Sequence, residues 1–222
     1  MKYKKSLFVL IVVSSVSTPS LHAQGTFQNL GFEQAAIVPV GGGNPSFYVV
    51  AASALPNWNT YINNSTVDWI VHNTISLSGT AISIHDAASS RTPLRGNYSV
   101  FLQGSSATLS PNNVSVAQTG LIPVGSQSLL FRAWGDNFQV SVNGQTLSLI
   151  PVSSGGNYTV YGTDITPFAG SSTELRFTAL PTGSLFFDSI QFSTSPVPEP
   201  TIIVLTGIGA CLFGFRRWLR RK

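Results

Sequence analysis

The sequence is short of charged residues and has a single cysteine. Asp, Glu, Lys and Arg make up 9% of its 222 residues, and Cys211 lies in an apolar run near the C-terminus. The rest of the chain can therefore form no internal disulfide. We expect its stability to come from packing, with a bound metal ion as a further source.

Positive charge is scarce between the two chain ends. Of the twelve Lys and Arg residues, three lie in the first five positions and five in the last seven. The stretch between them has four arginines against eight acidic residues, a net charge of −4. A nucleic-acid-binding protein needs cations on its folded surface, where they displace phosphate counterions. We therefore expect no nucleic-acid partner.

Motifs of catalytic and metal sites are absent from the sequence. No closely spaced histidine pair indicates zinc, and no Gly-x-Ser-x-Gly sequence indicates a nucleophilic serine. His85-Asp86 is the nearest approach to a His–carboxylate pair, and an adjacent pair of this kind is typical of a strand end. We expect the protein not to be an enzyme and to need no catalytic cofactor. A cryptic hydrolase is the remote alternative.

The first residues have the features of a secretory signal. Lys2, Lys4 and Lys5 precede an apolar run at 7–13, which is too short to span about 30 Å of hydrocarbon. We predict cleavage after Ala23, so that residues 1–23 are a signal peptide read by the general secretion machinery. A retained membrane helix is the alternative.

An apolar segment followed by a basic tail closes the sequence. Residues 201–215 carry no charge, and Trp218 and Leu219 extend the apolar character. Five cations accompany it: Arg216, Arg217, Arg220, Arg221 and Lys222. This pattern predicts a transmembrane helix at about 201–219 whose basic end stays in the cytoplasm, with the preceding domain outside. The alternative, a core helix of the soluble domain, would bury several cations at a high cost.

Directly before this segment stand Val197, Pro198, Glu199 and Pro200. With the apolar run and the basic tail, residues 196–222 resemble the PEP-CTERM sorting signal of exported bacterial proteins. In that family the membrane protease-transpeptidase exosortase reads the triplet. The resemblance implies transient anchoring in the inner membrane, then delivery to the cell surface or an exopolysaccharide matrix. A sorting signal gives an address and does not say what the domain does there.

Residues 24–195 are predicted to form one all-β sandwich. No window has helical periodicity, and short β-rich runs alternate with Gly, Pro, Asn and Ser. The strongest pattern is a hairpin at 138–149, where Asn143-Gly144 supplies the positive φ angles of a type I′ turn. Its predicted strands are 138–142 and 146–150. The others are 26–32, 47–51, 67–72, 81–85, 98–103, 114–119, 128–133, 158–161, 174–179 and 185–192.

Four short motifs, at 29–33, 55–58, 96–102 and 186–192, occur in that order. They resemble the galactose-binding-like jelly roll, the scaffold of many carbohydrate-binding modules. In that family an N-terminal Glu and an Asp of the last strand often share a structural Ca²⁺, and Glu33 and Asp188 match those positions. Carboxylate and carbonyl oxygens suit this ion. The alternative is that both carboxylates are solvated residues at strand ends.

Sugar-binding surfaces stack flat aromatic rings on pyranose rings and bond the hydroxyls with amides or carboxylates. Two predicted loops have this composition. The candidate ligand-binding residues are Trp134, Asp136, Asn137 and Trp58, with a core position as the alternative for both tryptophans. Trp69, between two valines of the same strand parity, is predicted to lie in the core.

The sequence thus predicts an exported, non-catalytic module that interacts with extracellular polysaccharide. A purely structural or adhesive surface protein without a sugar site is the alternative. The two hypotheses differ in whether Trp134 or Trp58 is exposed beside Asn or Asp.

Overall fold

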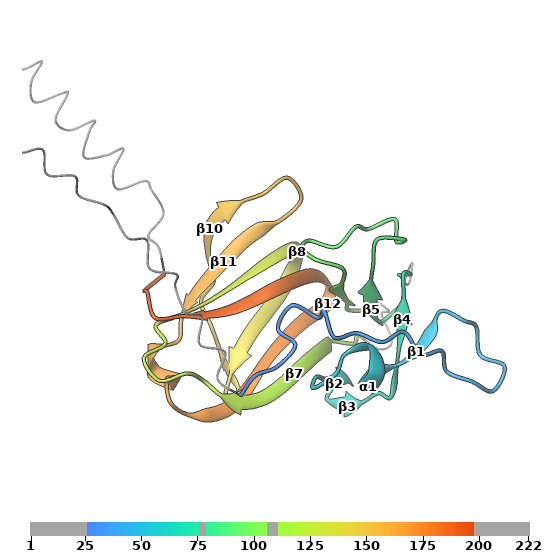
Figure 1. Cartoon of the computed structure of the whole chain (residues 1–222), viewed down its shortest axis with the longest axis horizontal. Coiled ribbons are helices and arrows are strands. Elements are labelled where there is room, and N and C mark those ends of the chain that lie inside the picture. The colour runs from blue at the N-terminus through green and yellow to red at the C-terminus, as the bar shows by residue number, and fades with distance from the viewer. Residues whose placement is uncertain (1–25, 76–78, 106–110, 198–222) are drawn as a thin grey trace, which may run out of the picture.

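The computed structural model describes residues 26–75, 79–105 and 111–197, and these form a β-sandwich (Figure 1). The sandwich confirms the predicted all-β class. In chain order the elements are β1 (Tyr48–Val50), α1 (Ala51–Ala54), β2 (Asn59–Ile62), β3 (Ser65–Thr66), β4 (Trp69–His72), β5 (Ala81–His85), β6 (Ser99–Gln103), β7 (Val114–Leu121), β8 (Ser128–Val142), β9 (Gln145–Thr146), β10 (Ile150–Ser154), β11 (Thr159–Asp164), the 3-10 helix η1 (Thr166–Phe168) and β12 (Ser172–Ser193).

Two long strands, β8 and β12, run through both layers of the sandwich. Residues 172–179 of β12 lie between β7 and the end of β8, whereas residues 184–193 follow the start of β8 and, at 184–187, also pair with β6. The register shifts between these two parts, where both strands bend. A Cβ on Gly135 would overlap the Ser184 carbonyl oxygen, and one on Gly183 would overlap that of Asn137. Glycine therefore allows the two backbones to approach at the bend.

The bend divides the hydrogen-bonded strands into two layers. The first layer has the order β10-β11-β8-β12-β6-β5-β4-β1, and the second has β9-β8-β12-β7-β2-β3. Strands β4 and β5 run parallel, and the other pairings are antiparallel.

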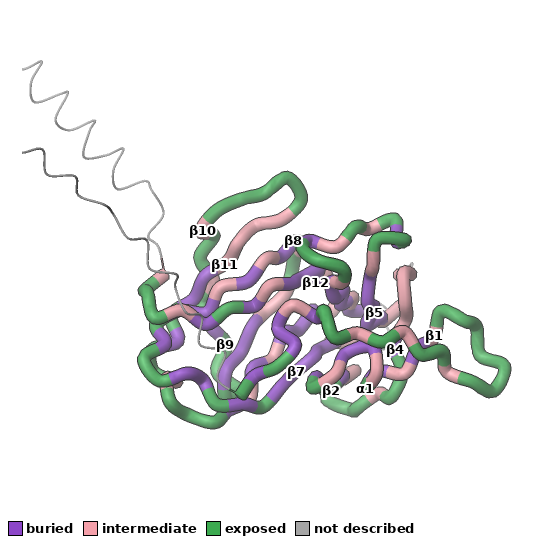
Figure 2. Tube along the Cα trace, viewed as in Figure 1, coloured by how far each residue is buried: buried purple, intermediate pink, exposed green. Residues whose placement is uncertain are grey.

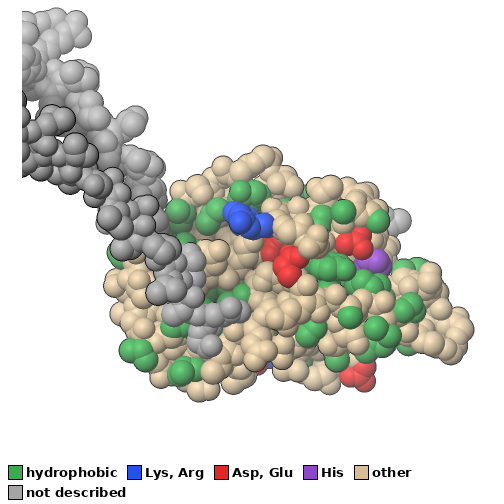
Figure 3. Space-filling view, viewed as in Figure 1, with side chains coloured by type: hydrophobic (Ala, Val, Ile, Leu, Met, Phe, Trp, Pro, Cys, Tyr) green, Lys and Arg blue, Asp and Glu red, His purple; other side chains and the backbone are tan. Residues whose placement is uncertain are grey.

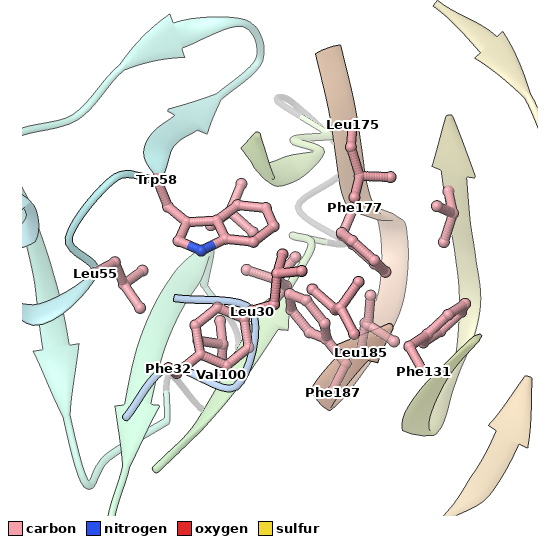
Figure 4. Packing of buried hydrophobic residues seen from close by; sticks show 14 of the residues in the cluster. Leu30, Phe32, Leu55, Trp58, Val100, Phe131, Leu175, Phe177, Leu185 and Phe187 are labelled. Carbon is pink, nitrogen blue, oxygen red and sulfur yellow. The ribbon is translucent and has the colours of Figure 1, made fainter. Parts of the chain in front are cut away.

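The hydrophobic core lies between the two layers. Phe177 and Phe187, from the two parts of β12, stack across it with ring centroids 4.5 Å apart. Phe32 and Trp58 enter the same core from the segments outside the layers, 5.6 Å apart (Figure 4). Burial of each such side chain contributes about 1.5–3 kcal/mol to the free energy of folding, relative to an exposed side chain. Figure 2 shows burial along the central strands and exposure in the loop before β1 and in the β10–β11 hairpin.

Several predicted elements match the structure. Strand β5 has the predicted bounds, and the β8–β9 hairpin turns at Asn143 and Gly144 with φ angles of 52° and 74°. This confirms the predicted turn, although β9 ends at Thr146 and a new strand begins at Ile150.

Other predicted elements are wrong. Residues 26–32 form turns, because Asn29 and Phe32 have positive φ and the Phe32 N–H donates to the Asn29 carbonyl. Residues 128–142 and 172–193 are each one strand where two were predicted. The polar Gly-containing stretches inside them bend but stay paired.

The predicted signal peptide, the C-terminal helix and the basic tail lie outside the described residues. Of the sorting motif, Val197 is described and its side chain lies against Gly162. Across residues 26–75, 79–105 and 111–197, no helix has the length and apolar character needed to cross a membrane.

Candidate functional site

The candidate site lies on the side of the first layer that faces away from the core, called here the outer face. Val100 and Phe187 point into the core, so the residues next to them on β6 and β12 face outward. The register then places Phe101, Phe186 and Trp134 in one row across β6, β12 and β8.

Trp134 is the exposed member of this row. It is 45% exposed, whereas Phe101 and Phe186 are buried under Leu94 and neighbouring side chains. The guanidinium of Arg91 lies 4.8 Å from the Trp134 ring centroid and 5.0 Å from that of Phe101. Trp134 therefore lies on β8 and not in the predicted loop, with a cation–π contact on its ring.

Polar groups lie on both sides of Trp134 along β8. Asp136 faces the same side, and its Oδ1 accepts a hydrogen bond from Ser184 Oγ at 3.2 Å. In the other direction the Arg132 guanidinium lies 5.0 Å from the Tyr158 ring centroid. Nη1 of Arg132 donates to Ser189 Oγ at 3.3 Å. An exposed ring, a carboxylate and two guanidinium groups thus gather on one face.

The outer face also holds polar atoms without partners. Five buried side-chain atoms have no hydrogen-bond partner within the described part of the chain, and four belong to this face: Ser83 Oγ, His85 Nε2, Gln103 Oε1 and Arg132 Nε. Buried polar atoms are normally paired with protein or water. All four atoms are buried, so they are not contacts for a ligand on the surface of this face.

Trp58 is not part of this face, and its prediction as a ligand-binding residue is wrong. It is 4% exposed, packs against Phe32 and Phe177, and donates from Nε1 to the Asn29 carbonyl at 3.2 Å (Figure 4). No face of its ring is open to a ligand, which agrees with the core alternative.

Asn137 and Trp69 also lie in unexpected places. The amide of Asn137 donates to the Pro181 carbonyl at 2.7 Å and so braces the bend of β8 and β12. Trp69 is 49% exposed, so its predicted core position is wrong. On β4 the core takes Ile70, and Trp69 has the opposite parity.

Glu33 and Asp188 come together, far apart in sequence, at one pocket of about 360 Å³. Asp188 is 1% exposed, and its Oδ2 accepts hydrogen bonds from Ser99 Oγ at 2.7 Å and Arg95 N at 3.1 Å. Burial raises the pKa of Asp188 to about 7, against these hydrogen bonds, which lower it. Glu33 accepts from the backbone and side-chain nitrogens of Asn97, each at 2.9 Å.

A bulge in β12 shapes this pocket. The register shifts between Asp188 and Gln191, and Ser189 has a φ of 54°, with its N–H donating to Asp188 Oδ1. Neither Glu33 nor Asp188 forms an ion pair with a described residue. The described residues contain no group of three or more His, Cys, Asp and Glu side chains able to hold a metal ion.

Sequence reasoning missed Arg91, Arg132 and Tyr158 as neighbours of Trp134. The positions of these three side chains relative to Trp134 depend on strand register and on the path of the loop after β5. No local sequence pattern indicates either of these. The low charge of the sequence is visible on the surface, where Figure 3 shows mostly uncharged side chains with a few acidic and basic ones.

No protein-family model and no curated protein matches this chain. One similar solved structure is the carbohydrate-binding module TmCBM61 in complex with β-1,4-galactotriose, with 12% identity, 77% of this chain and 98% of that chain covered, and a TM-score of 0.38. Another is a family 29 carbohydrate-binding module, with 13% identity, 69% and 94% covered, and a TM-score of 0.38. The enzymatically active domain of tailspike protein 4 from bacteriophage CBA120 has 13% identity, 62% and 19% covered, and a TM-score of 0.37. At these TM-scores the similarities carry no weight for function.

Proposed function

We propose that this chain is an exported, non-catalytic module of jelly-roll type that binds extracellular polysaccharide through the outer face around Trp134. The observation that carries the proposal is an exposed indole on a strand, with Asp136, Arg91 and Arg132 on the same face. The indole stacks on the apolar face of a pyranose ring, and the charged groups bond its hydroxyls.

The contacts of the two described histidines favour a binding module over an enzyme. His72 contacts Asp86 at 2.9 Å, and the other partners of that carboxylate are Asn73 and the Ala88 N–H, none of them a nucleophile. His85 Nδ1 lies 2.6 Å from Ser89 Oγ, but both residues are buried, so a substrate cannot reach the pair.

Affinity electrophoresis tests the proposed sugar site. The purified full chain, in a detergent without a sugar head group, is run through gels containing mixed-linkage β-glucan, galactan or mannan. We expect at least one neutral polymer to retard it. Trp134→Ala should weaken that binding about tenfold, the contribution of one stacked ring, and Trp134→Phe should weaken it less.

Val124→Ala is the matched control, because it removes an exposed apolar side chain from the β7–β8 loop. It should be retarded like the unchanged protein. Absence of retardation on every polymer would favour the structural or adhesive alternative. Equal retardation of Trp134→Ala and the unchanged chain would show that the polymer binds elsewhere than at Trp134.

We also propose that exosortase sorts the chain from the inner membrane to the cell surface or matrix. The order of Val197, Pro198, Glu199 and Pro200, the apolar run and the basic tail supports this. The two ends of the described chain lie near each other, which is compatible with a membrane-directed segment at each end of the sequence. Thr26 N bonds the Leu121 carbonyl and Gln127 N bonds that of Ser193, so both ends of the described chain meet the β7–β8 connection.

We further propose that Glu33 and Asp188 hold a structural Ca²⁺. Two carboxylates line one pocket, and the buried one has no cationic partner among the described residues. A hard cation with oxygen ligands suits such a site. With two side chains available, backbone carbonyls and water would supply the remaining ligands.

A further inference from the structure

A second cluster of exposed aromatic residues lies at the β1–β4 edge of the first layer. The Tyr48 ring centroid is 4.6 Å from that of Phe47 and 4.7 Å from that of Trp69, the latter pair nearly perpendicular at 81°. Phe47 is 41% exposed and Trp69 is 49% exposed. Trp69 is therefore held by packed neighbours while about half of it stays in solvent.

This cluster and Trp134 share the outer face. Val49 and Ile70 point into the core, so Tyr48 and Trp69 point to the opposite side. One row of cross-strand neighbours links the two ends of the face: Tyr48, Val71, Ser83, Phe101, Phe186 and Trp134. Five inter-strand steps of about 4.8 Å separate β1 from β8, or roughly 24 Å along the sheet.

The chemistry of the cluster fits a neutral ligand. A pocket of about 230 Å³ beside it is lined by Val40, Asn44, Tyr48 and Trp69. Asn44 Nδ2 donates to the Gly41 carbonyl at 2.8 Å, which fixes an amide next to the rings. Residues 34–67 contain no Asp, Glu, Lys or Arg. Aromatic faces beside an amide and a phenol suit an uncharged pyranose better than an ionic partner.

The backbone of this edge is not free to pair with a strand of another chain. Val40 N donates to the Tyr48 carbonyl at 2.8 Å, and Val50 N donates to the Val38 carbonyl at 2.9 Å. Pro39, which bridges to Val49, has no N–H to offer. The edge therefore presents side chains, which suits stacking on a ligand better than sheet extension by a second copy.

We infer that one neutral polysaccharide chain runs across the strands from Trp134 to Trp69, so that the protein binds long internal stretches in preference to short oligosaccharides. This inference rests on the proposed function. Between the two ends the polysaccharide passes over Arg91 and Leu94, which cover Phe101 and Phe186. Two linked contacts on one polymer raise its affinity through effective concentration.

The test compares polymers with short oligosaccharides. The full chain, in the same detergent, is titrated with mixed-linkage β-glucan, galactan and mannan, and with the trisaccharide of each. We expect Trp69→Ala to weaken polymer binding by roughly three- to tenfold and to leave trisaccharide binding at Trp134 unchanged. Trp69→Phe should restore part of the loss, and Val124→Ala is again the control. Trp134→Ala should weaken both.

Each other outcome identifies what fails. If the unchanged protein binds a polymer and Trp69→Ala binds it equally well, the inference is wrong and the proposed function stands. If Trp69→Ala instead turns a dimer into a monomer in size-exclusion chromatography, with polymer binding unchanged, the cluster is a contact between copies. If no polymer binds the unchanged protein, the proposed function itself fails.

Discussion

At the scale of single residues, His85 couples the stability of the fold to pH. It is 1% exposed and lies at the edges of the Phe101 and Phe186 rings, with centroids 6.0 and 5.5 Å away. Burial, and then the positive charge of Arg91, lowers the pKa of His85 to about 4. The folded protein therefore keeps His85 neutral at a pH where the unfolded chain has already taken up a proton.

Acid should weaken the fold through this residue. Because the pKa of His85 is lower in the folded protein, the part of the stability that depends on neutral His85 is fully present above the unfolded pKa of about 6.5. It is lost as the pH falls toward 4. The pKa of Asp188, raised to about 7, changes the stability in the opposite sense over the same pH range, so the contribution of His85 is measured against a variant that keeps Asp188. Between pH of about 7.5 and about 5, urea unfolding should show the unchanged protein losing about 2 kcal/mol relative to His85→Leu. His72→Gln, which changes the other described histidine, should show the same pH dependence as the unchanged protein. An equal change of stability with pH in His85→Leu and in the unchanged protein would contradict this assignment.

The described tryptophans show what can be read from sequence one residue at a time. Apolar alternation places Trp69 and its valine neighbours on one side of a strand but does not say which side meets the core. Ile70 takes the core side, so Trp69 is exposed. For Trp58 the polar neighbours indicated a loop, and the ring turns inward from it. Side-chain direction was decided by packing partners distant in sequence.

At the scale of elements, local patterns predicted where most strands occur but, except for β5, seldom where they end. The polar Gly-Asp-Asn stretch in β8 and the Pro-Thr-Gly stretch in β12 have the composition of turns. Each bends its strand, and the strands remain paired on both sides of the bend. A bend shared by two strands depends on their register, which no single stretch encodes. The pairing of Glu33 with Asp188 followed from a family resemblance, because 155 positions separate the two in sequence.

A bound cation would join two elements, the N-terminal segment that carries Glu33 and the last strand that carries Asp188. If Ca²⁺ binds only the folded state, millimolar Ca²⁺ should raise the melting temperature by roughly 5–10 °C relative to chelator. Glu33→Gln and Asp188→Asn should each abolish the rise. Asp136→Asn, which changes an exposed carboxylate of β8, should keep it. An identical melting temperature in chelator and in Ca²⁺ would show that the pocket holds no metal.

At the scale of the whole molecule, the aromatic cluster around Trp69 and the two ends of the described chain lie at opposite ends of the domain. The loop before β1 projects at the end of the domain away from both ends of the described chain (Figure 1). The Trp69 cluster lies beside that loop. A protein held at its C-terminal end would thus present the aromatic edge farthest from its attachment.

The proposed sorting depends on the triplet before the apolar run. In a bacterium that has an exosortase, the unchanged protein should yield a shortened form outside the inner membrane. Replacing Pro198, Glu199 and Pro200 by Ala should leave a full-length form in the membrane fraction, because the enzyme no longer recognises its site while the basic tail still holds the helix in place. Immunoblots of the fractions measure both forms.

Pro196→Ala, which leaves the triplet intact, is the matched control and should be processed normally. The unchanged protein in the same strain without its exosortase should behave like the triplet variant. If the triplet variant is shortened and released as efficiently as the unchanged chain, the triplet does not direct sorting. The basic tail would then act only as a membrane stop, and polysaccharide binding by the outer face would need another explanation for how the protein meets its ligand.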